Sequence, residues 1–171
     1  MTPPPCLLPP REPVAGFEWS VHACPRRHKA EVDAVWPGLS TDALLVVPVC
    51  QRSSVDLVGI GPHVEADKDK LLERFTAFAV AATSALEANG FWADYVDPCS
   101  GLPMRHREGG GAYGEVQALV TLRGFATANA GCCTIVLHPR WGSSVYPASL
   151  VTTAPVERLE KALDEALASL P

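Results

Sequence analysis

Two adjacent cysteines are the residues of this sequence best suited to chemistry. Cys132 and Cys133 follow the short flexible stretch Asn129-Ala130-Gly131 and open a run of residues that favour a β-strand. A thiolate is a nucleophile and a soft ligand, so an accessible member of the pair would act as a redox group or bind a soft metal centre. The alternative is structural, because free cysteines are among the residues most often buried and pack as small hydrophobic side chains.

Alternation along a strand distinguishes the two thiols. In a strand that begins at Cys132, this thiol shares a face with the polar His138. Cys133 then joins Ile135 and Leu137 on the other face, where every neighbour is apolar. We therefore expect Cys133 to be buried and Cys132 to be reachable. Six residues along a strand span about 20 Å, too far for a hydrogen bond between Cys132 and His138, so acyl transfer is disfavoured.

The spacing of the cysteines favours free thiols over disulfides or zinc. No pair has the Cys-x-x-Cys spacing of a zinc knuckle or a thioredoxin-type site, and a ring closed between neighbouring cysteines would be strained. A chain of this length and apolar content also needs no disulfide to stabilise its core. The sequence predicts an intracellular protein with six free cysteines: Cys6, Cys24, Cys50, Cys99, Cys132 and Cys133.

Other polar and aromatic residues are assigned structural roles. Asp97 precedes Pro98 and is predicted to cap a turn, and Trp92 and Trp141 are predicted to anchor the core or an interface. The segment 105–114 carries three of its glycines in a row, buries little by composition, and is predicted to be a mobile loop that acts as a lid or docking element. It lacks the Gly-Lys-Ser/Thr ending of a phosphate-binding loop.

The order of elements predicts one α+β domain over residues 14–171. Residues 1–13 include six prolines and are predicted to form a flexible, extended arm. Period-two alternation or continuous apolar runs predict strands, and apolar residues at spacings of three and four predict helices. The expected strands are 17–23, 43–50, 91–96, 115–123, 133–137 and 146–151, and the expected helices are 26–35, 67–89 and a final one that starts at Pro155 with Thr153 as its cap.

Composition narrows the class of protein. Hydrophobic residues make up 47% of the 171 residues and charged residues 19%, which predicts a packed globule. A net charge of −5 provides no basic surface for nucleic acid or for anionic lipid. No apolar run is long enough to span a bilayer, and no secretory or mitochondrial leader is evident, so we expect a cytoplasmic protein with no nucleic-acid or membrane partner.

Several motifs, taken in order, resemble one known family. They extend roughly from residue 17 to 165, and each is weak alone, whereas the ordered set is specific. The set closely resembles the methylmalonic aciduria and homocystinuria type D protein family, CblD. The strongest motifs are Gly90-Phe91-Trp92-Ala93-Asp94-Tyr95-Val96-Asp97-Pro98-Cys99-Ser100-Gly101-Leu102, Gly131-Cys132-Cys133 and His138-Pro139-Arg140-Trp141-Gly142.

The resemblance implies a cobalamin-trafficking adaptor that is not itself an enzyme. It implies a nitroreductase-like α+β scaffold with a mostly antiparallel central sheet, flanking helices and no flavin. Family members dock on the cobalamin-processing chaperone CblC, share cobalamin with it, and route the cofactor toward methionine synthase and methylmalonyl-CoA mutase. The family's cobalt-coordinating thiolate corresponds to Cys132, with Cys133, His138, Trp141 and Asp97 as candidate supporting residues.

Two rival functions stay open at this point. The inherited scaffold would also support a flavin-dependent reductase or a thiol oxidoreductase, although the sequence shows no phosphate-binding cluster for a flavin nucleotide. The third interpretation is a protein-binding module that never contacts the cofactor. Partner binding that is indifferent to cobalamin would favour that third interpretation.

Overall fold

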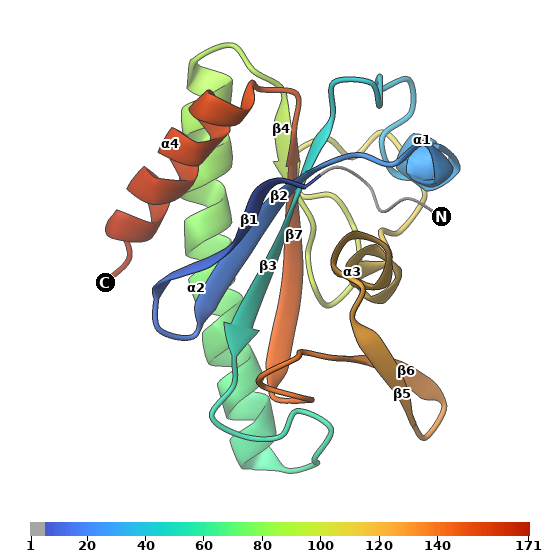
Figure 1. Ribbon diagram of the computed structural model, residues 1–171, viewed down its shortest axis with the longest axis vertical. Coiled ribbons are helices and arrows are strands. Elements are labelled where there is room, and N and C mark those ends of the chain that lie inside the picture. The colour runs from blue at the N-terminus through green and yellow to red at the C-terminus, as the bar shows by residue number, and fades with distance from the viewer. Residues whose placement is uncertain (1–5) are drawn as a thin grey trace.

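A computed structural model describes residues 6–171 and confirms the α+β class. Its centre is a five-stranded antiparallel sheet in the order β1-β2-β3-β7-β4, and β5 and β6 form a separate two-stranded ribbon (Figure 1). The strands are β1 (Cys6–Val14), β2 (Phe17–Ala23), β3 (Leu45–Arg52), β4 (Ala93–Tyr95), β5 (Ala126–Ala130), β6 (Cys133–Leu137) and β7 (Val145–Thr152). The helices are η1 (Arg26–His28), α1 (Lys29–Val35), α2 (Pro62–Ala88), α3 (Glu115–Arg123) and α4 (Val156–Ala168).

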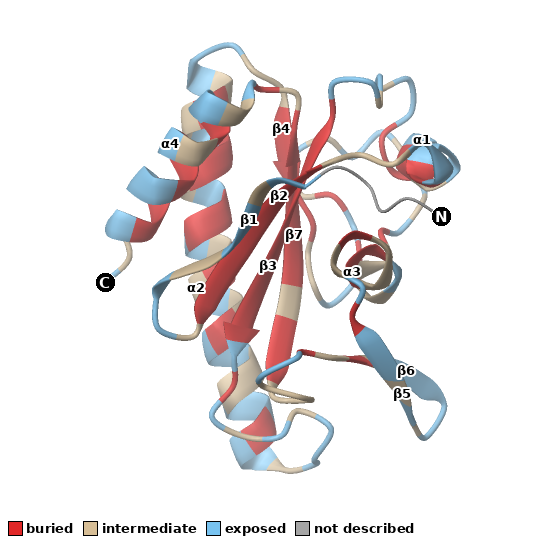
Figure 2. Ribbon diagram, viewed as in Figure 1, coloured by how far each residue is buried: buried red, intermediate tan, exposed pale blue. Residues whose placement is uncertain are grey.

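Helices cover both faces of the central sheet. α2 and α4 pack on one face, and α1 and α3 lie on the other (Figures 1 and 2). β3 shows both contacts, because Val47 and Val49 join the core under α2 and α4 whereas Val46 joins the core under α1 and α3. The continuous apolar run at this strand was predicted to be buried on both faces, and the prediction is confirmed.

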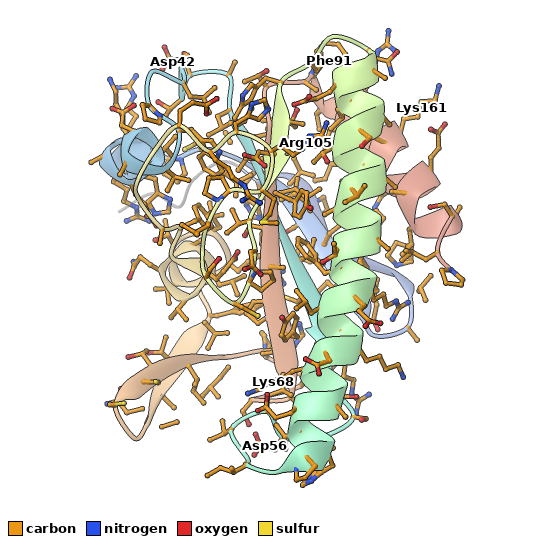
Figure 3. The ribbon with its side chains drawn as sticks, turned by 180° about the vertical axis from the view of Figure 1, so that it is seen from behind. Asp42, Asp56, Lys68, Phe91, Arg105 and Lys161 are labelled. Carbon is orange, nitrogen blue, oxygen red and sulfur yellow. The ribbon has the colours of Figure 1, made fainter. Side chains whose placement is uncertain are left out.

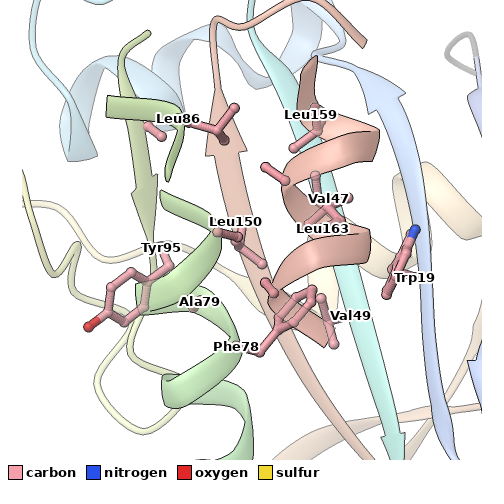
Figure 4. Close-up of a cluster of buried hydrophobic side chains, with 14 of the residues drawn as sticks. Trp19, Val47, Val49, Phe78, Ala79, Leu86, Tyr95, Leu150, Leu159 and Leu163 are labelled. Carbon is pink, nitrogen blue, oxygen red and sulfur yellow. The ribbon is translucent and has the colours of Figure 1, made fainter. Parts of the chain in front are cut away.

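The main core lies between the sheet and the two long helices. Trp19 stacks on Phe78 of α2 with ring centroids 5.7 Å apart, and Leu150 and Leu163 complete the contact from β7 and α4 (Figure 4). The helical spacing of Leu71, Phe75, Phe78, Ala79, Ala82 and Leu86 buries one face of α2, as predicted. Gly90 follows the helix with φ +84°, the left-handed conformation expected of the residue that ends it.

Strand β1 corrects the prediction of a flexible arm. Residues 6–13 pair with β2 along the edge of the sheet, and Arg11 lies over the ring of Trp19 while it bridges Glu160 and Asp164 of α4. Prolines are tolerated because an edge strand has one row of unpaired backbone groups, and the pairing is interrupted by register shifts. Residues 1–5 of the predicted arm lie outside the described residues.

Two further local predictions are wrong. Residues 115–123 form helix α3 and no strand, because Ala118, Leu119 and Leu122 turn one helical face toward the sheet and Gly124 ends the helix at φ +65°. The period-two alternation in this short segment also fits a helical spacing, and tertiary packing selects the helix. Thr153 does not cap α4, whose first turn follows Pro155 without a side-chain cap.

The glycine-rich loop 105–114 packs against its surroundings. Buried Asp94 accepts hydrogen bonds from the backbone N–H groups of Arg105 (2.9 Å) and His106 (3.1 Å). The Arg105 side chain reaches Glu87 of α2 at 3.2 Å. Figure 3 shows Arg105 beside that helix. A Cβ at Gly109 would lie 2.5 Å from the carbonyl oxygen of Val35, so only glycine allows this approach to α1.

Glycine substitutions in this loop should have unequal effects. Gly109→Ala forces a backbone clash with α1 and should lower the free energy of unfolding by about 1–3 kcal/mol. Gly110→Ala is the matched control, since its Cβ would meet no atom within 4 Å, and it should be close to neutral. Urea denaturation measures both, and equal effects would contradict the packed loop.

A buried carboxyl stands at the start of α3. Glu115 accepts a hydrogen bond from the Ser149 hydroxyl at 2.6 Å, and its other oxygen is buried without a partner. Burial raises the pKa of Glu115 to about 7. The folded state therefore holds this proton more tightly than the unfolded state, and stability is lost as pH rises through the window from about 4.5 to about 7.

Glu115→Gln should remove this pH dependence, because the amide keeps an acceptor for Ser149 and carries no charge. Between pH 4.5 and pH 8 the wild type should lose up to about 3 kcal/mol of unfolding free energy relative to the variant. Urea denaturation at a series of pH values measures it. A difference that does not change with pH would show that Glu115 is not held neutral.

None of the helices in the described part of the chain is long and apolar enough to cross a membrane.

Candidate functional site at the β5–β6 hairpin

The two cysteines lie at the tip of the β5–β6 hairpin. Ala130 pairs with Cys133, so the connecting turn consists of Gly131 and Cys132 alone. Gly131, the first turn residue, has φ +64°. Cys132, the second, has a negative φ, because every described residue with a positive φ is a glycine. This is the pattern of a type II′ turn, which matches the twist of a two-stranded ribbon. A Cβ at Gly131 would meet nothing within 4 Å, so glycine is required by its conformation and not by space.

Both thiols are exposed, which corrects the prediction that Cys133 is buried. Their Sγ atoms lie 4.0 Å apart. The alternation argument assumed that one face of the strand meets a core, yet β6 belongs to a ribbon that stands away from the central sheet (Figures 1 and 2). Burial begins only toward the base of the ribbon, where Val136 joins Leu119 and Phe125. Cys132 is exposed, as predicted.

The pKa values of the thiols differ between the buried cysteines and those at the hairpin tip. Burial raises the pKa of Cys24 to about 11 and that of Cys50 to about 12, so these two thiols stay protonated at neutral pH. The pKa of Cys133 is raised by its hydrogen bond with Cys132 and by the charge that Cys132 would carry. A second thiolate at the tip is therefore disfavoured once the first has formed.

A buried ionic cluster holds the base of the hairpin. Glu18 of β2 accepts a hydrogen bond from Arg123 of α3 at 3.0 Å, and its same oxygen lies 3.2 Å from Nε2 of His138. Arg140 donates to the other oxygen of Glu18 at 3.2 Å. The Trp141 ring stacks on His138 with centroids 4.0 Å apart. The segment that follows β6 is thereby attached both to the central sheet and to α3.

His138 and Trp141 lie at the base of the hairpin and not at its tip. The His138 ring is enclosed by Phe125 and Trp141, and burial lowers its pKa despite the neighbouring Glu18. A neutral imidazole in this enclosure positions the hairpin and is not available as a ligand or base at the tip. Sequence reasoning selected both residues but missed Glu18, because a charged residue at an alternate position of a strand is typical of a solvent-facing side chain, whereas here it is buried.

Asp97 is a turn residue, as the sequence predicted. Its carboxylate accepts hydrogen bonds from the backbone of Cys99 at 3.2 Å and from the Ser100 hydroxyl at 2.7 Å. These bonds shape the turn after β4. In the described residues, no group of three or more His, Cys, Asp or Glu side chains could hold a metal ion.

Comparison with known proteins identifies the family. The family model for the methylmalonic aciduria and homocystinuria type D protein matches residues 12–163. The chain belongs to this family. It is 29% identical over 140 residues to the cobalamin trafficking proteins CblD of Homo sapiens and Rattus norvegicus, and 30% identical to that of Gallus gallus. These alignments cover 82% of the chain and 47% of each relative, so the chain spans about half the length of these CblD proteins.

Glu18 should contribute more to stability than Glu12, a partly buried neighbour that also contacts Arg140. Glu18→Gln leaves Arg123 without its buried counter-charge and should lower the free energy of unfolding by about 2–4 kcal/mol. Glu12→Gln is the matched control, because Glu12 also bridges Arg140, at 2.8 Å, but lies near solvent, and should cost about 1 kcal/mol or less. Chemical denaturation compares them, and a larger loss for Glu12→Gln would contradict the assignment.

Proposed function

We propose that this CblD-family chain is a cobalamin-trafficking adaptor that binds cobalt through the Cys132 thiolate while a CblC-type chaperone presents the cofactor. The observation that carries the proposal is the exposed Cys132 at the tip of a projecting hairpin. Cobalamin is proposed as the cofactor because curated relatives are named cobalamin trafficking proteins. In this role the protein transfers a cofactor and catalyses no reaction of its own. The nitroreductase-like ancestry of the scaffold stays a prediction.

The geometry suits a metal that already has most of its ligands. A corrin ring occupies the four equatorial positions of cobalt, so a protein that approaches from one side supplies a single axial ligand. That ligand must extend beyond its own surface, because the flat macrocycle would otherwise clash with the surrounding protein. A thiol in a two-residue turn meets this requirement, and a thiolate is a soft ligand that later ligand exchange can displace.

Cys132 is favoured over Cys133 by its place in the hairpin. Cys132 is a turn residue, whereas Cys133 is in the ladder opposite Ala130. The neighbouring thiol also raises the pKa of Cys133, so the pair presents one thiolate more readily than two. Below the tip, Glu18 and Arg123 attach the base of the hairpin to the central sheet and to α3 through His138.

Delivery to methionine synthase or to methylmalonyl-CoA mutase is the downstream part of the proposal. It follows from the family resemblance alone. Release of cobalt from a single thiolate requires the loss of one bond, which an acceptor enzyme with its own axial ligand would promote.

Two cysteine substitutions test the coordination. The chain is mixed with a CblC-type chaperone and cob(II)alamin, and the ultraviolet-visible and electron paramagnetic resonance spectra are recorded. Wild type and Cys133→Ser should shift both spectra, because each retains the turn thiol, whereas Cys132→Ser should leave the spectra of the chaperone complex unchanged. If Cys132→Ser retains the shift and Cys133→Ser abolishes it, the assignment of the ligand is wrong. A protein that purifies yellow with bound flavin would instead favour a reductase.

A further inference from the structure

An apolar groove runs beside the cysteine hairpin. It has a volume of about 160 Å³ and lies between the loop that follows β3, the first turn of α3, the strand β6 and the start of β7. None of the side chains that line it is charged. Its lining includes Leu57 and Val58 from the loop, Thr134, Ile135 and Val136 from β6, and Pro147 from β7.

The groove follows the edge of β6. Side chains of successive strand residues point to opposite faces, so a depression on one face would be lined by alternate residues. Here the three consecutive residues 134–136 contribute, and β5 contributes none. The groove therefore extends along the outer edge of β6 for about 10 Å.

That edge has no partner in the described part of the chain. β6 pairs with β5 alone, and the ribbon contains no third strand. Across the groove, β7 is paired with β4 only from Leu150 onward, so its first residues, including Pro147, have no strand beside them on that side. Isolated two-stranded ribbons are marginally stable, and an uncharged open edge favours the addition of a strand.

The loop that forms the other wall exposes large apolar side chains. Val58 is 41% exposed and Ile60, two residues further on, is 95% exposed. Figure 3 shows Asp56 of the same loop beside the first turns of α2, away from the helix-covered core. Two large apolar side chains are thus exposed on a loop that lies beside an open strand edge.

We infer that the groove receives an extended, uncharged segment of the protein that presents cobalamin, and that this segment adds a third strand at the edge of β6. The inference rests on the proposed function, because continuity with the thiols selects the occupant. Thr134, which lines the groove, directly follows Cys133. A protein that brings cobalt to the hairpin tip is therefore within one or two residues of this flank.

The chemistry of the groove defines the segment that fits. Backbone N–H and C=O groups along the edge of β6 supply hydrogen bonds to an extended backbone, and they do not depend on its sequence. Alternate side chains of the segment would contact Leu57 and Val136, so these side chains are apolar. A charged residue at such a position would lose its hydration without gaining a counter-ion.

Acidic substitutions test the docking surface at two places: Val58 in the wall of the groove, and Ile60 on the exposed loop beside it. Val58→Asp and Ile60→Asp should each weaken binding to a CblC-type chaperone loaded with cob(II)alamin by about tenfold or more, because they place a charge where an apolar segment docks. Val80→Asp on α2 is the matched control, since Val80 is 42% exposed, and it should bind like wild type. Isothermal titration calorimetry measures the dissociation constants, and urea denaturation confirms that each variant is folded.

Hydrogen exchange tests the strand itself. Outward-facing amides of residues 134–136 should exchange about tenfold or more slowly in the complex than in the free chain. Unchanged exchange at β6, or wild-type affinity of both Val58→Asp and Ile60→Asp, would overturn the inference. A self-association of this chain that Ile60→Asp abolishes, without any change in chaperone binding, would also overturn it and make a second copy the occupant.

The two proposals can fail separately. Cys132→Ser removes the ligand but leaves the groove intact, so it should retain protection at β6 while it loses the spectral shift. If the shift does not depend on Cys132 and the groove variants still weaken binding, the coordination fails and the docking surface stands. If the shift depends on Cys132 and the groove variants bind normally, the docking surface fails and the coordination stands.

Discussion

The buried carboxylate of Glu18 is the contact on which the position of the hairpin depends. Its two oxygens meet Arg123, His138 and Arg140, which come from the end of α3 and from the segment after β6. An unpaired carboxylate at this depth would cost several kcal/mol, so these groups must converge whenever the chain is folded. Strand β2, helix α3 and the base of the ribbon are thereby held in one arrangement.

The burial of the hairpin residues decreases from its base to its tip. Val136 packs with Leu119 and Phe125, whereas Cys133 and the turn residue Cys132 are in solvent. The base of the hairpin is packed and its tip is exposed to solvent. No single residue can be both packed in a core and accessible to a partner. A ribbon meets both requirements because it spans from a core to solvent within five residues of each strand. The apolar groove beside it extends the exposed surface that a partner would meet.

The sequence predicted elements well where one local rule dominated. β2 has the predicted ends, and β3 is buried on both faces, because neither clear alternation nor a short β-branched apolar run fits a helix well. Segment 115–123 was misassigned because its apolar residues satisfy both a period of two and a helical spacing. Strand β1 was missed because its many prolines indicate only which backbone conformations the segment prefers. They do not indicate that β2 leaves a free sheet edge with which the segment can pair.

For the site, the sequence by itself determined which side chains are present and that a strand runs over residues 133–137. The expected strand begins at Cys132, whereas the structure places Cys132 in the turn between β5 and β6. The sequence contained the thiol pair, the glycine that the turn requires and the ordered motifs that mark the CblD family. Only the tertiary structure decided that Cys133 is exposed, that Glu18 anchors His138, and that a groove lies beside β6. The physical reason is that turn conformation depends on neighbouring residues, whereas burial and charge pairing depend on segments that are distant in the chain and meet only after folding.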